Sequence, residues 1–200
     1  HTNCMLVGTE GVLLVDPGSP YPEEQEALAR VIDGIEAEGR SIEAVLLTHH
    51  HYDHVAGAAA VAARTGAPIV AHARTAKLLA SGPQIDRTVD DGECWQAGAV
   101  GRVRGIFTPG HAPGHMAFLC ERMGLLLAGD LVAGVGTVIV DPADGDMIDY
   151  LDSLKRVSSL GIRTIIPAHG PAIFGAEAAL EDLLEHRYFR VAKIVEALGR

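Results

Sequence analysis

The sequence predicts an α/β protein in which β-sheets and helices form layers. Strand-like and helix-like segments alternate along the chain, and both halves contain stretches rich in short strands. The 200 residues correspond to one large domain, since domains usually contain about 100–200 residues. A chain of this length can bury most of its apolar surface without disulfide support.

The N-terminal half is predicted to begin with a hairpin, whose strands are Cys4–Val7 and Gly11–Val15. A turn is predicted to follow at Asp16–Pro20. Pro22 begins the first helix, at a position where the missing N–H has no cost, and Gly39 ends it. The apolar run Ala44–Leu47 is typical of a strand that is buried on both faces. The next predicted elements are a helix, a strand and a helix, at Val55–Arg64, Pro68–Ala71 and Arg74–Ala80.

The C-terminal half is predicted to contain short strands and two further helices. Its strands are expected at Gly105–Thr108, Met116–Cys120, Leu125–Ala128 and Thr164–Ile166. A helix is expected over Leu151–Val157, before the last of these strands. The final helix extends from about Ala176 to Leu198 and carries one apolar stripe, formed by Leu180, Leu183, Leu184, Tyr188, Val191, Ala192 and Val195.

Composition and charge exclude several classes of protein. The formal net charge of −10 repels polyanions, so we expect no binding to duplex DNA. No apolar run approaches the roughly 20 residues that a membrane-spanning helix needs, so no membrane partner is expected. The three cysteines are scattered and suit a reducing compartment, which predicts a cytoplasmic protein. No signal sequence is visible, and the opening at His1 rather than at a methionine leaves room for upstream residues.

Histidine is the unusual residue of this chain. It occurs ten times, and four copies fall within the six residues His49–His54, between a predicted strand and a predicted helix. Alternate residues of an extended loop share a face, so His49 and His51 can converge on one point. Asp53 and His54, at the turn into the helix, can face a second point nearby. Imidazole suits zinc, and a neighbouring carboxylate adds negative charge for a second dication, so the segment predicts a metal site.

Three later segments each end a predicted strand with a metal-ligand side chain. His111 follows Thr108-Pro109-Gly110, Asp130 follows an apolar strand, and His169 follows Ile165–Ala168. A buried carboxylate such as Asp130 is costly unless it is paired or bound to a metal. Together with the histidine cluster, these residues supply seven candidate ligands for two metal ions: His49, His51, Asp53, His54, His111, Asp130 and His169.

The motifs HxHxDH, PGHxxGH, a strand-end GD and a late HG resemble those of the metallo-β-lactamase superfamily over nearly the whole chain. The resemblance implies an αββα sandwich of two mixed β-sheets flanked by helices, with a dinuclear site along one edge. It assigns His49, His51 and His111 to one zinc ion, Asp53, His54 and His169 to the other, and Asp130 to both. It also implies hydrolysis by a hydroxide that bridges the two ions, with Asp53 as the catalytic residue that orients it. Manganese and iron are alternative metals for such ligands.

Within the superfamily, the sequence looks most like the β-lactamase-like protein 2 family. Asp130 excludes the lactamase classes that have a cysteine or no carboxylate at this position, and its short spacing to His169 excludes a large β-CASP insertion. The matching segments are Thr2-Asn3, Gly136–Val138, Asp144–Met147, His169–Pro171 and His186-Arg187. Animal members of that family are endoribonucleases, and members carry a winged-helix-like domain after the last helix. We therefore predict a metallo-β-lactamase-like domain over residues 1–175 and a C-terminal helix over 176–200, which leads toward a domain that is not in this chain.

Three functions remain open from the sequence. The first is a dinuclear zinc hydrolase of the β-lactamase-like protein 2 type, with a phosphodiester or single-stranded RNA as substrate. The second is a hydrolase similar to glyoxalase II, with a small ester or thioester as substrate. The third is a metal-binding fold without catalysis, against which the complete set of seven ligands counts.

A few other residues are candidates for secondary roles. His115 and Tyr52 are candidate substrate contacts, although His115 could instead support a ligand or be an ordinary loop residue. Tyr52 alternates with the ligands and so points the other way, which makes a structural role its alternative. A basic stretch on the last helix is either a solvated face or a phosphate contact; its members are His186, Arg187, Arg190 and Lys193.

Overall fold

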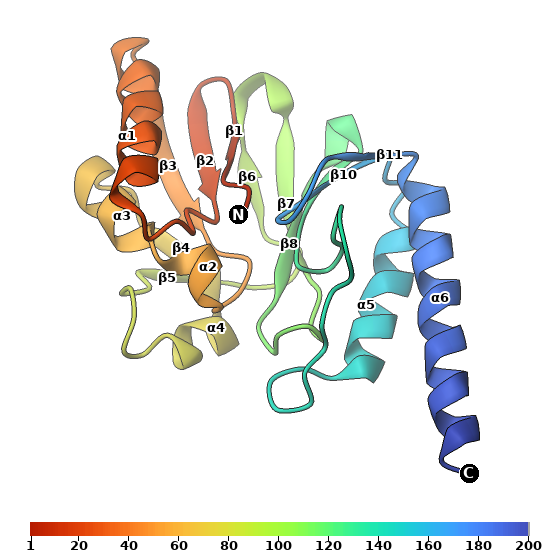
Figure 1. Ribbon diagram of the computed structural model, residues 1–200. Helices are drawn as coiled ribbons and strands as arrows, with labels where there is room; N and C mark the ends of the chain where they lie inside the picture. Colours follow the sequence, from red (N-terminus) through yellow and green to blue (C-terminus); the bar gives the residue numbers. More distant parts are fainter. Residues whose placement is uncertain (200) are drawn as a thin grey trace.

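Two mixed β-sheets pack face to face in the computed structural model, which describes residues 1–199. Helices cover the outer face of each sheet, so that the layers follow the order helix, sheet, sheet, helix (Figure 1). The predicted αββα sandwich is therefore confirmed.

The first sheet is formed by the N-terminal half of the chain. Its strands, in spatial order, are β1 (Met5–Val7), β2 (Gly11–Val15), β3 (Ser41–Leu46), β4 (Ile69–His72) and β5 (Arg87–Val89). β1 and β2 form the predicted antiparallel hairpin, whereas β2 to β5 are parallel. Parallel neighbours require crossover connections. The connections include α1 (Pro22–Ala37), α2 (Tyr52–Val55), α3 (Ala58–Thr65) and α4 (Ala73–Leu78).

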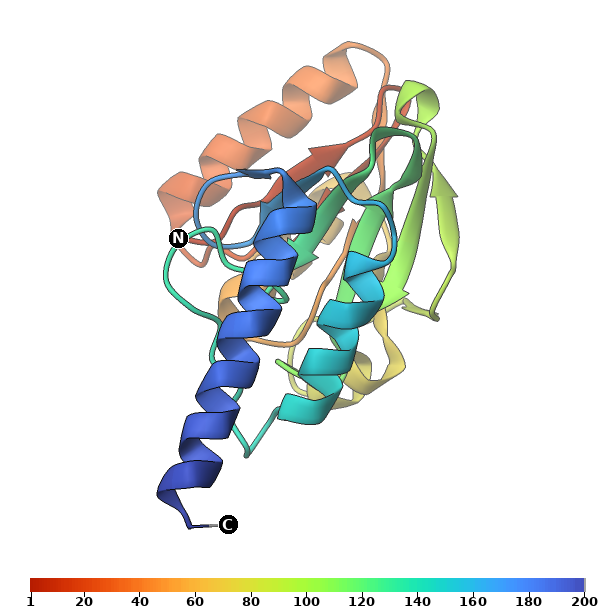
Figure 2. The same cartoon turned by 90° about the vertical axis from the view of Figure 1, so that its right-hand side faces the viewer.

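The second sheet is formed by the C-terminal half. Its strands, in spatial order, are β11 (Ile173–Phe174), β10 (Thr164–Pro167), β9 (Leu125–Gly129), β8 (Met116–Cys120), β7 (Arg102–Phe107) and β6 (Cys94–Gln96). Only β9 and β10 are parallel, because α5 (Met147–Ser158) lies in the connection between them. Short 3-10 turns occur at Gly98–Val100 and Glu121–Met123. The last helix, α6 (Ala176–Ala197), lies beside α5 and extends beyond the rest of the molecule (Figure 2).

The core has three apolar layers, which follow from the alternation of side chains along each strand. Leu13 points into the layer between the two sheets, where it joins Phe118. Its neighbour Leu14 points outward and packs with Ile32 of α1. The third layer lies between the second sheet and helices α5 and α6.

The structure differs from the predicted elements where tertiary contacts decide the outcome. The helix expected over Val55–Arg64 is interrupted at Gly57, whose N–H donates to the carbonyl of Pro17. A Cβ at Gly57 would lie 2.6 Å from that oxygen, so the close approach requires glycine. On α6, Leu180 is buried, but later members of the expected stripe such as Tyr188 are exposed. Residue 200, the end of the predicted C-terminal segment, lies outside the described residues.

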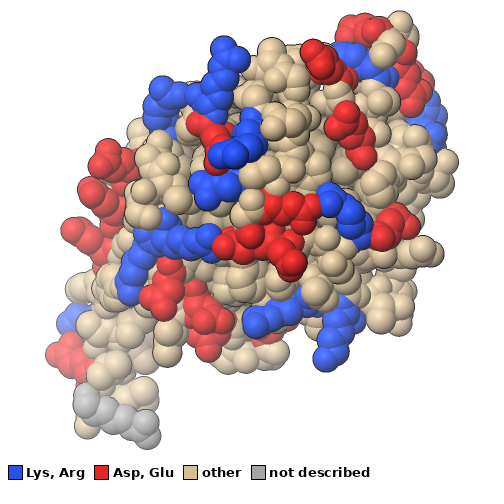
Figure 3. All heavy atoms as spheres, turned by 180° about the vertical axis from the view of Figure 1, so that it is seen from behind, with Lys and Arg blue, Asp and Glu red and all other residues tan. Residues whose placement is uncertain are grey.

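The surface carries both signs of charge. On the face opposite to that of Figure 1, acidic and basic side chains are interspersed rather than separated (Figure 3). Across residues 1–199, none of the helices combines the length and the apolar character that crossing a membrane requires.

The loops that carry the candidate ligands lie at one edge of the sandwich. β2 and β3 are parallel, so the loops that follow them leave the first sheet at the same edge. β7 and β9 are each antiparallel to β8, and β10 is parallel to β9, so their carboxyl ends also share an edge. The candidate ligands all come directly after these strands.

Candidate metal centre

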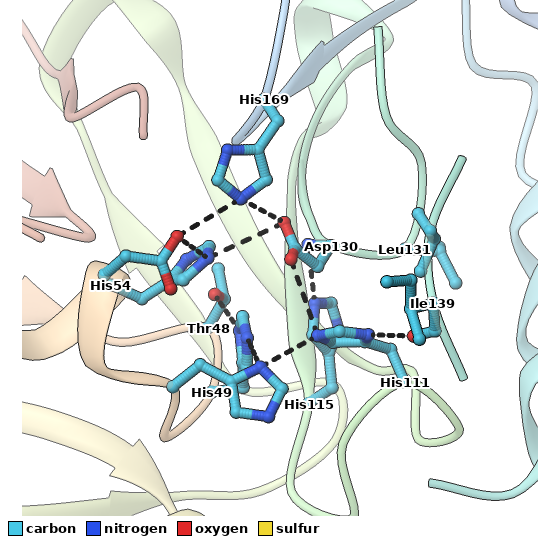
Figure 4. A network of polar contacts seen from close by, with 12 residues as sticks. Thr48, His49, His54, His111, His115, Asp130, Leu131, Ile139 and His169 are labelled. Atoms are coloured by element: carbon cyan, nitrogen blue, oxygen red, sulfur yellow. Dashed lines mark hydrogen bonds and ion pairs between the residues drawn. The ribbon is translucent and has the colours of Figure 1, made fainter. Parts of the chain in front are cut away.

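All seven predicted ligands come together at this shared edge. The loop after β3 supplies two histidines, α2 supplies an aspartate and a histidine, and the ends of β7, β9 and β10 supply one residue each. Figure 4 shows several of these side chains pointing toward one another across the gap between the two sheets. Candidate ligands that are far apart in the sequence thus lie close together, because the strands that precede them end at the same edge of the sandwich.

The first ligand group consists of three histidines whose ring nitrogens face one another. His49 Nε2 lies 2.9 Å from His51 Nδ1, and that atom lies 3.0 Å from His111 Nε2. The other nitrogen of each ring has its own partner, and these partners decide where the protons are.

The proton positions can be assigned from the partners. The backbone carbonyl of Ile139 accepts from His111 Nδ1 at 2.7 Å, and the Asp144 carboxylate accepts from His51 Nε2 at 2.7 Å. The Thr48 hydroxyl donates to Asp16 at 2.6 Å, so it accepts the proton of His49 Nδ1 at 3.0 Å. The three nitrogens that face one another therefore carry lone pairs. Lone pairs at such distances repel unless a cation lies between them, so this group fits a metal ion.

The second ligand group is formed by Asp53, His54 and His169. Asp53 Oδ2 lies 3.4 Å from His169 Nε2 and 3.7 Å from His54 Nε2. His54 Nδ1 is bound to Asp16 at 2.8 Å, whereas its Nε2 is buried and lacks a hydrogen-bond partner among residues 1–199. An unpartnered buried nitrogen is costly, and a metal ion would satisfy it. The residues therefore fit a second ion.

Asp130 lies between the two groups. Its Oδ2 atom is 3.5 Å from His111 Nε2 in the first group. Its Oδ1 atom is 3.3 Å from His169 Nε2 and 3.6 Å from His54 Nε2 in the second. One carboxylate oxygen thus faces each group, which is the arrangement that a bridging ligand requires.

The electrostatics of the site differ between the two groups. Burial lowers the pKa of His49 and of His111, which favours the neutral rings that bind metal. Burial also acts to lower the pKa of His54, but Asp16 and Asp130 raise it to about 10. The pKa of Asp130, which burial alone would raise, falls to about 2 because of His54 and the other histidines. Without metal, His54 is thus a buried cation held between carboxylates, and a dication would take over that role.

Asp16 contacts the candidate ligand His54 and is not among the candidate residues named from the sequence. It is fully buried and adopts a positive φ of 50°. Its carboxylate accepts from the Thr48 N–H at 2.8 Å, from the Thr48 hydroxyl and from His54 Nδ1. The segment Asp16–Pro20 was interpreted as a turn. The available signal was the same as for Asp130, namely an aspartate directly after an apolar strand.

His115 lies behind a candidate ligand. Its side chain is fully buried, which favours the supporting role over the role of a substrate contact. Its Nε2 atom accepts from the Asp130 N–H at 3.0 Å, and Nδ1 lies 2.8 Å from the Thr108 hydroxyl. Burial lowers the pKa of His115 to about 3, in keeping with a neutral ring. The second candidate contact, Tyr52, is 68% exposed beside Asp53 and stays a prediction.

Two of the four residues of the basic stretch on the last helix, Arg187 and Lys193, have partners within the protein. Arg187 donates to the carbonyl of Val138 at 2.6 Å and lies over the ring of Tyr150. Lys193 pairs with Glu196 at 3.0 Å on the same helix. Arg187 therefore connects α6 to the loop after β9.

Comparisons with known proteins agree with this geometry. A family model described as the metallo-beta-lactamase superfamily matches residues 1–169. The lactamase-like protein vrtG of Penicillium aethiopicum is 35% identical over 203 residues, which cover 99% of this chain and 61% of vrtG. The chain spans about three fifths of the length of the curated relatives that it matches.

Solved structures share the fold over most of the chain. The metallo-beta-lactamase family protein TTHA1429 from Thermus thermophilus has a TM-score of 0.81 and 26% identity, and the match covers 100% of this chain and 78% of that one. TTHA1623, solved in a di-iron-bound form, has a TM-score of 0.72 and 28% identity over 90% of this chain and 92% of that one. With the family match over residues 1–169, these likenesses show that the chain belongs to the metallo-beta-lactamase superfamily.

Proposed function

We propose that this chain is a dinuclear, zinc-dependent hydrolase that cleaves an uncharged ester or thioester with an apolar acyl group. The observation that carries the proposal is the position of Asp130, whose two oxygens face the two separate ligand groups. Zinc is the proposed metal because five of the seven ligands are histidines. The relative TTHA1623 binds two iron ions, so iron is the first alternative to compare.

The chain's own residues have distinct parts in this reaction. When bound, the two ions act as Lewis acids, which make a water molecule acidic enough to react at neutral pH and polarise the attacked oxygen. The Asp53 side chain is about half exposed, and the Thr2 hydroxyl donates to its Oδ2 atom at 2.9 Å. That carboxylate is positioned to orient the attacking water and to accept its proton. His115 holds the backbone of Asp130 in place by accepting a hydrogen bond from its N–H.

The surroundings of the ligands support an uncharged substrate. Among residues 1–199, the seven ligand side chains form ion pairs only with one another, with Asp16 and with Asp144, and none with lysine or arginine. A phosphodiester backbone is usually bound by such cations. On the last helix, Arg187, one of the four residues of the basic stretch, donates to the carbonyl of Val138.

Two exposed apolar side chains adjoin the ligands. Tyr52 is 68% exposed next to Asp53, and Ile139 is 72% exposed on the residue whose carbonyl binds His111. Figure 4 shows Ile139 beside His111 at the margin of the site. An apolar or aromatic acyl group would bury these surfaces on binding.

The test compares four substrates with zinc-loaded and iron-loaded protein: a benzoyl thioester, an acetyl thioester, a phenyl ester and a labelled single-stranded RNA. We expect the benzoyl thioester and the phenyl ester to be cleaved fastest and the RNA to stay intact. Asp53→Asn should reduce the rate at least about 100-fold, because it removes the proton acceptor. Asp152→Asn, an exposed change on α5, is the matched control and should keep full activity. RNA cleavage that is lost in Asp53→Asn would instead establish a nuclease. No cleavage by protein with two bound ions would favour the non-catalytic alternative.

A further inference from the structure

Asp144 contacts the first ligand group although 93 positions separate it from His51. It lies in the loop between β9 and α5, and its side chain is 28% exposed. Its Oδ2 atom is 2.7 Å from His51 Nε2 and 3.4 Å from His50 Nε2. The distance to His51 is typical of a charge-assisted hydrogen bond.

The turn that carries Asp144 is fixed against the backbone next to His111. The N–H groups of Asp144 and Gly145 both donate to the carbonyl of Asp141, and the Asp146 N–H donates to the carbonyl of Gly110 at 2.8 Å. A Cβ on Gly145 would lie 2.3 Å from that same carbonyl, so the turn packs closely there. The Asp144 carboxylate is thus held at a defined place rather than on a free loop.

The same loop contacts two of the three histidines of the first group. Ile139 accepts from His111 Nδ1, and Asp144 accepts from His51 Nε2. In each ring, the proton held by the loop leaves the opposite nitrogen with a free lone pair that faces the group. A carboxylate partner also makes the ligand nitrogen more basic and fixes the plane of the ring.

We propose that Asp144 is a positioning residue for His51, and that it sets the metal affinity of the first ligand group while the second group does not depend on it. This inference rests on the proposed function only in that both require a metal ion at the first group. The inference about Asp144 can be tested separately from the proposed function, because metal binding can be measured without any substrate.

A competing arrangement makes Asp144 a metal ligand. His50, His51 and Asp144 lie close enough to hold an ion, and His50 Nδ1 is buried without a hydrogen-bond partner among the described residues. The short distance between His51 Nε2 and Asp144 favours a proton between these atoms, because His51 Nδ1 is already committed to the first group. The number of ions bound per chain distinguishes the two arrangements.

The experiment measures zinc binding to the full chain by competition with a chromophoric chelator, which resolves stepwise affinities. The variants are Asp144→Ala, Asp144→Asn and the matched control Asp141→Asn. Asp141 lies in the same turn, where its carboxylate accepts from the Ala143 N–H at 2.9 Å without touching a histidine. Cobalt-loaded samples give absorption spectra that report the ligand geometry of the first group.

We expect two ions per chain in the unchanged protein. Asp144→Ala should weaken one step about 10–100-fold and leave the other within about twofold, and it should alter the cobalt spectrum. Asp144→Asn should weaken the same step by less, because its amide oxygen still accepts from His51. Asp141→Asn should match the unchanged protein in both steps and in the spectrum.

Three results would overturn the inference. The first is an unchanged pair of affinities in Asp144→Ala, and the second is an equal loss at both steps, which would indicate a general structural role. The third is a third ion that disappears in Asp144→Ala, which would make Asp144 a ligand. Two ions bound as expected but no hydrolysis of any substrate would refute the proposed function alone.

Discussion

Replacement of Asp16 by asparagine tests the account of how the ligands are held. The carboxylate is fully buried and accepts three hydrogen bonds: two from Thr48 and one from His54 Nδ1. Asparagine has nearly the same shape, but only one of its two terminal atoms is an acceptor. With its oxygen on the Thr48 N–H, its amide group faces the Thr48 hydroxyl and His54 Nδ1, which are both donors.

The size of the effect follows from these contacts. In the neutral ring that binds metal, relief of the contact between these donors would place the proton of His54 on Nε2 instead of Nδ1, and Nε2 is the atom that faces Asp53 and Asp130. That proton competes directly with a metal ion, so we expect a loss of about 10–100-fold in affinity at the second ligand group. If the proton stays on Nδ1, a buried donor is left unpaired, which costs about 1–3 kcal/mol of folding stability.

The assay combines stepwise zinc affinity with thermal unfolding of the metal-free protein. Asp86→Asn is the matched control, because Asp86 also accepts a backbone N–H, at 2.8 Å from Ile69, but is not part of the site. The reasoning is refuted if Asp16→Asn binds both ions within about twofold of the unchanged protein and unfolds at the same temperature.

Three further predictions concern pH, backbone and core. Because the pKa of His54 is raised to about 10 in the metal-free site, the second ion must displace a proton; its affinity should rise about tenfold per pH unit from pH 6 to 9. Calorimetry in buffers of different ionisation enthalpy should show about one proton released, and a pH-independent affinity would contradict this. Gly110 has a φ of 132°, and a Cβ at this residue would lie 2.2 Å from the Tyr150 nitrogen. Gly110→Ala should therefore lower the melting temperature strongly. An unchanged melting temperature would refute the close contact. Phe118→Ala should cost about 3–5 kcal/mol in denaturant unfolding because the ring has no exposed surface, and a cost below about 1 kcal/mol would contradict the packing.

The cluster of candidate ligands could be predicted because the signals were local. Each ligand follows a strand or lies in the His49–His54 segment, and the apolar pattern of a strand can be identified over five or six residues. Because these strands end at the same edge of the sandwich, the residues that follow them lie close together. The bridging position of Asp130, by contrast, came from the resemblance to a known family rather than from its spacing.

The supporting residues were less accessible to sequence analysis. Asp16 was assigned to a turn because proline and glycine follow it, and these residues dominate the local pattern. Asp144 meets His51 across 93 positions, and no local pattern encodes such a contact. Similarly, strands β5 and β6 have only three residues each, which is too short for an alternation to stand out.

Anomalous diffraction from a crystal of the zinc-loaded protein would test the central claim most directly. The account predicts two peaks per chain, one enclosed by His49, His51 and His111 and the other by Asp53, His54 and His169. Asp130 should lie between them with one oxygen toward each peak. A single peak, or a peak held by Asp144 in place of the first group, would contradict the dinuclear centre described above.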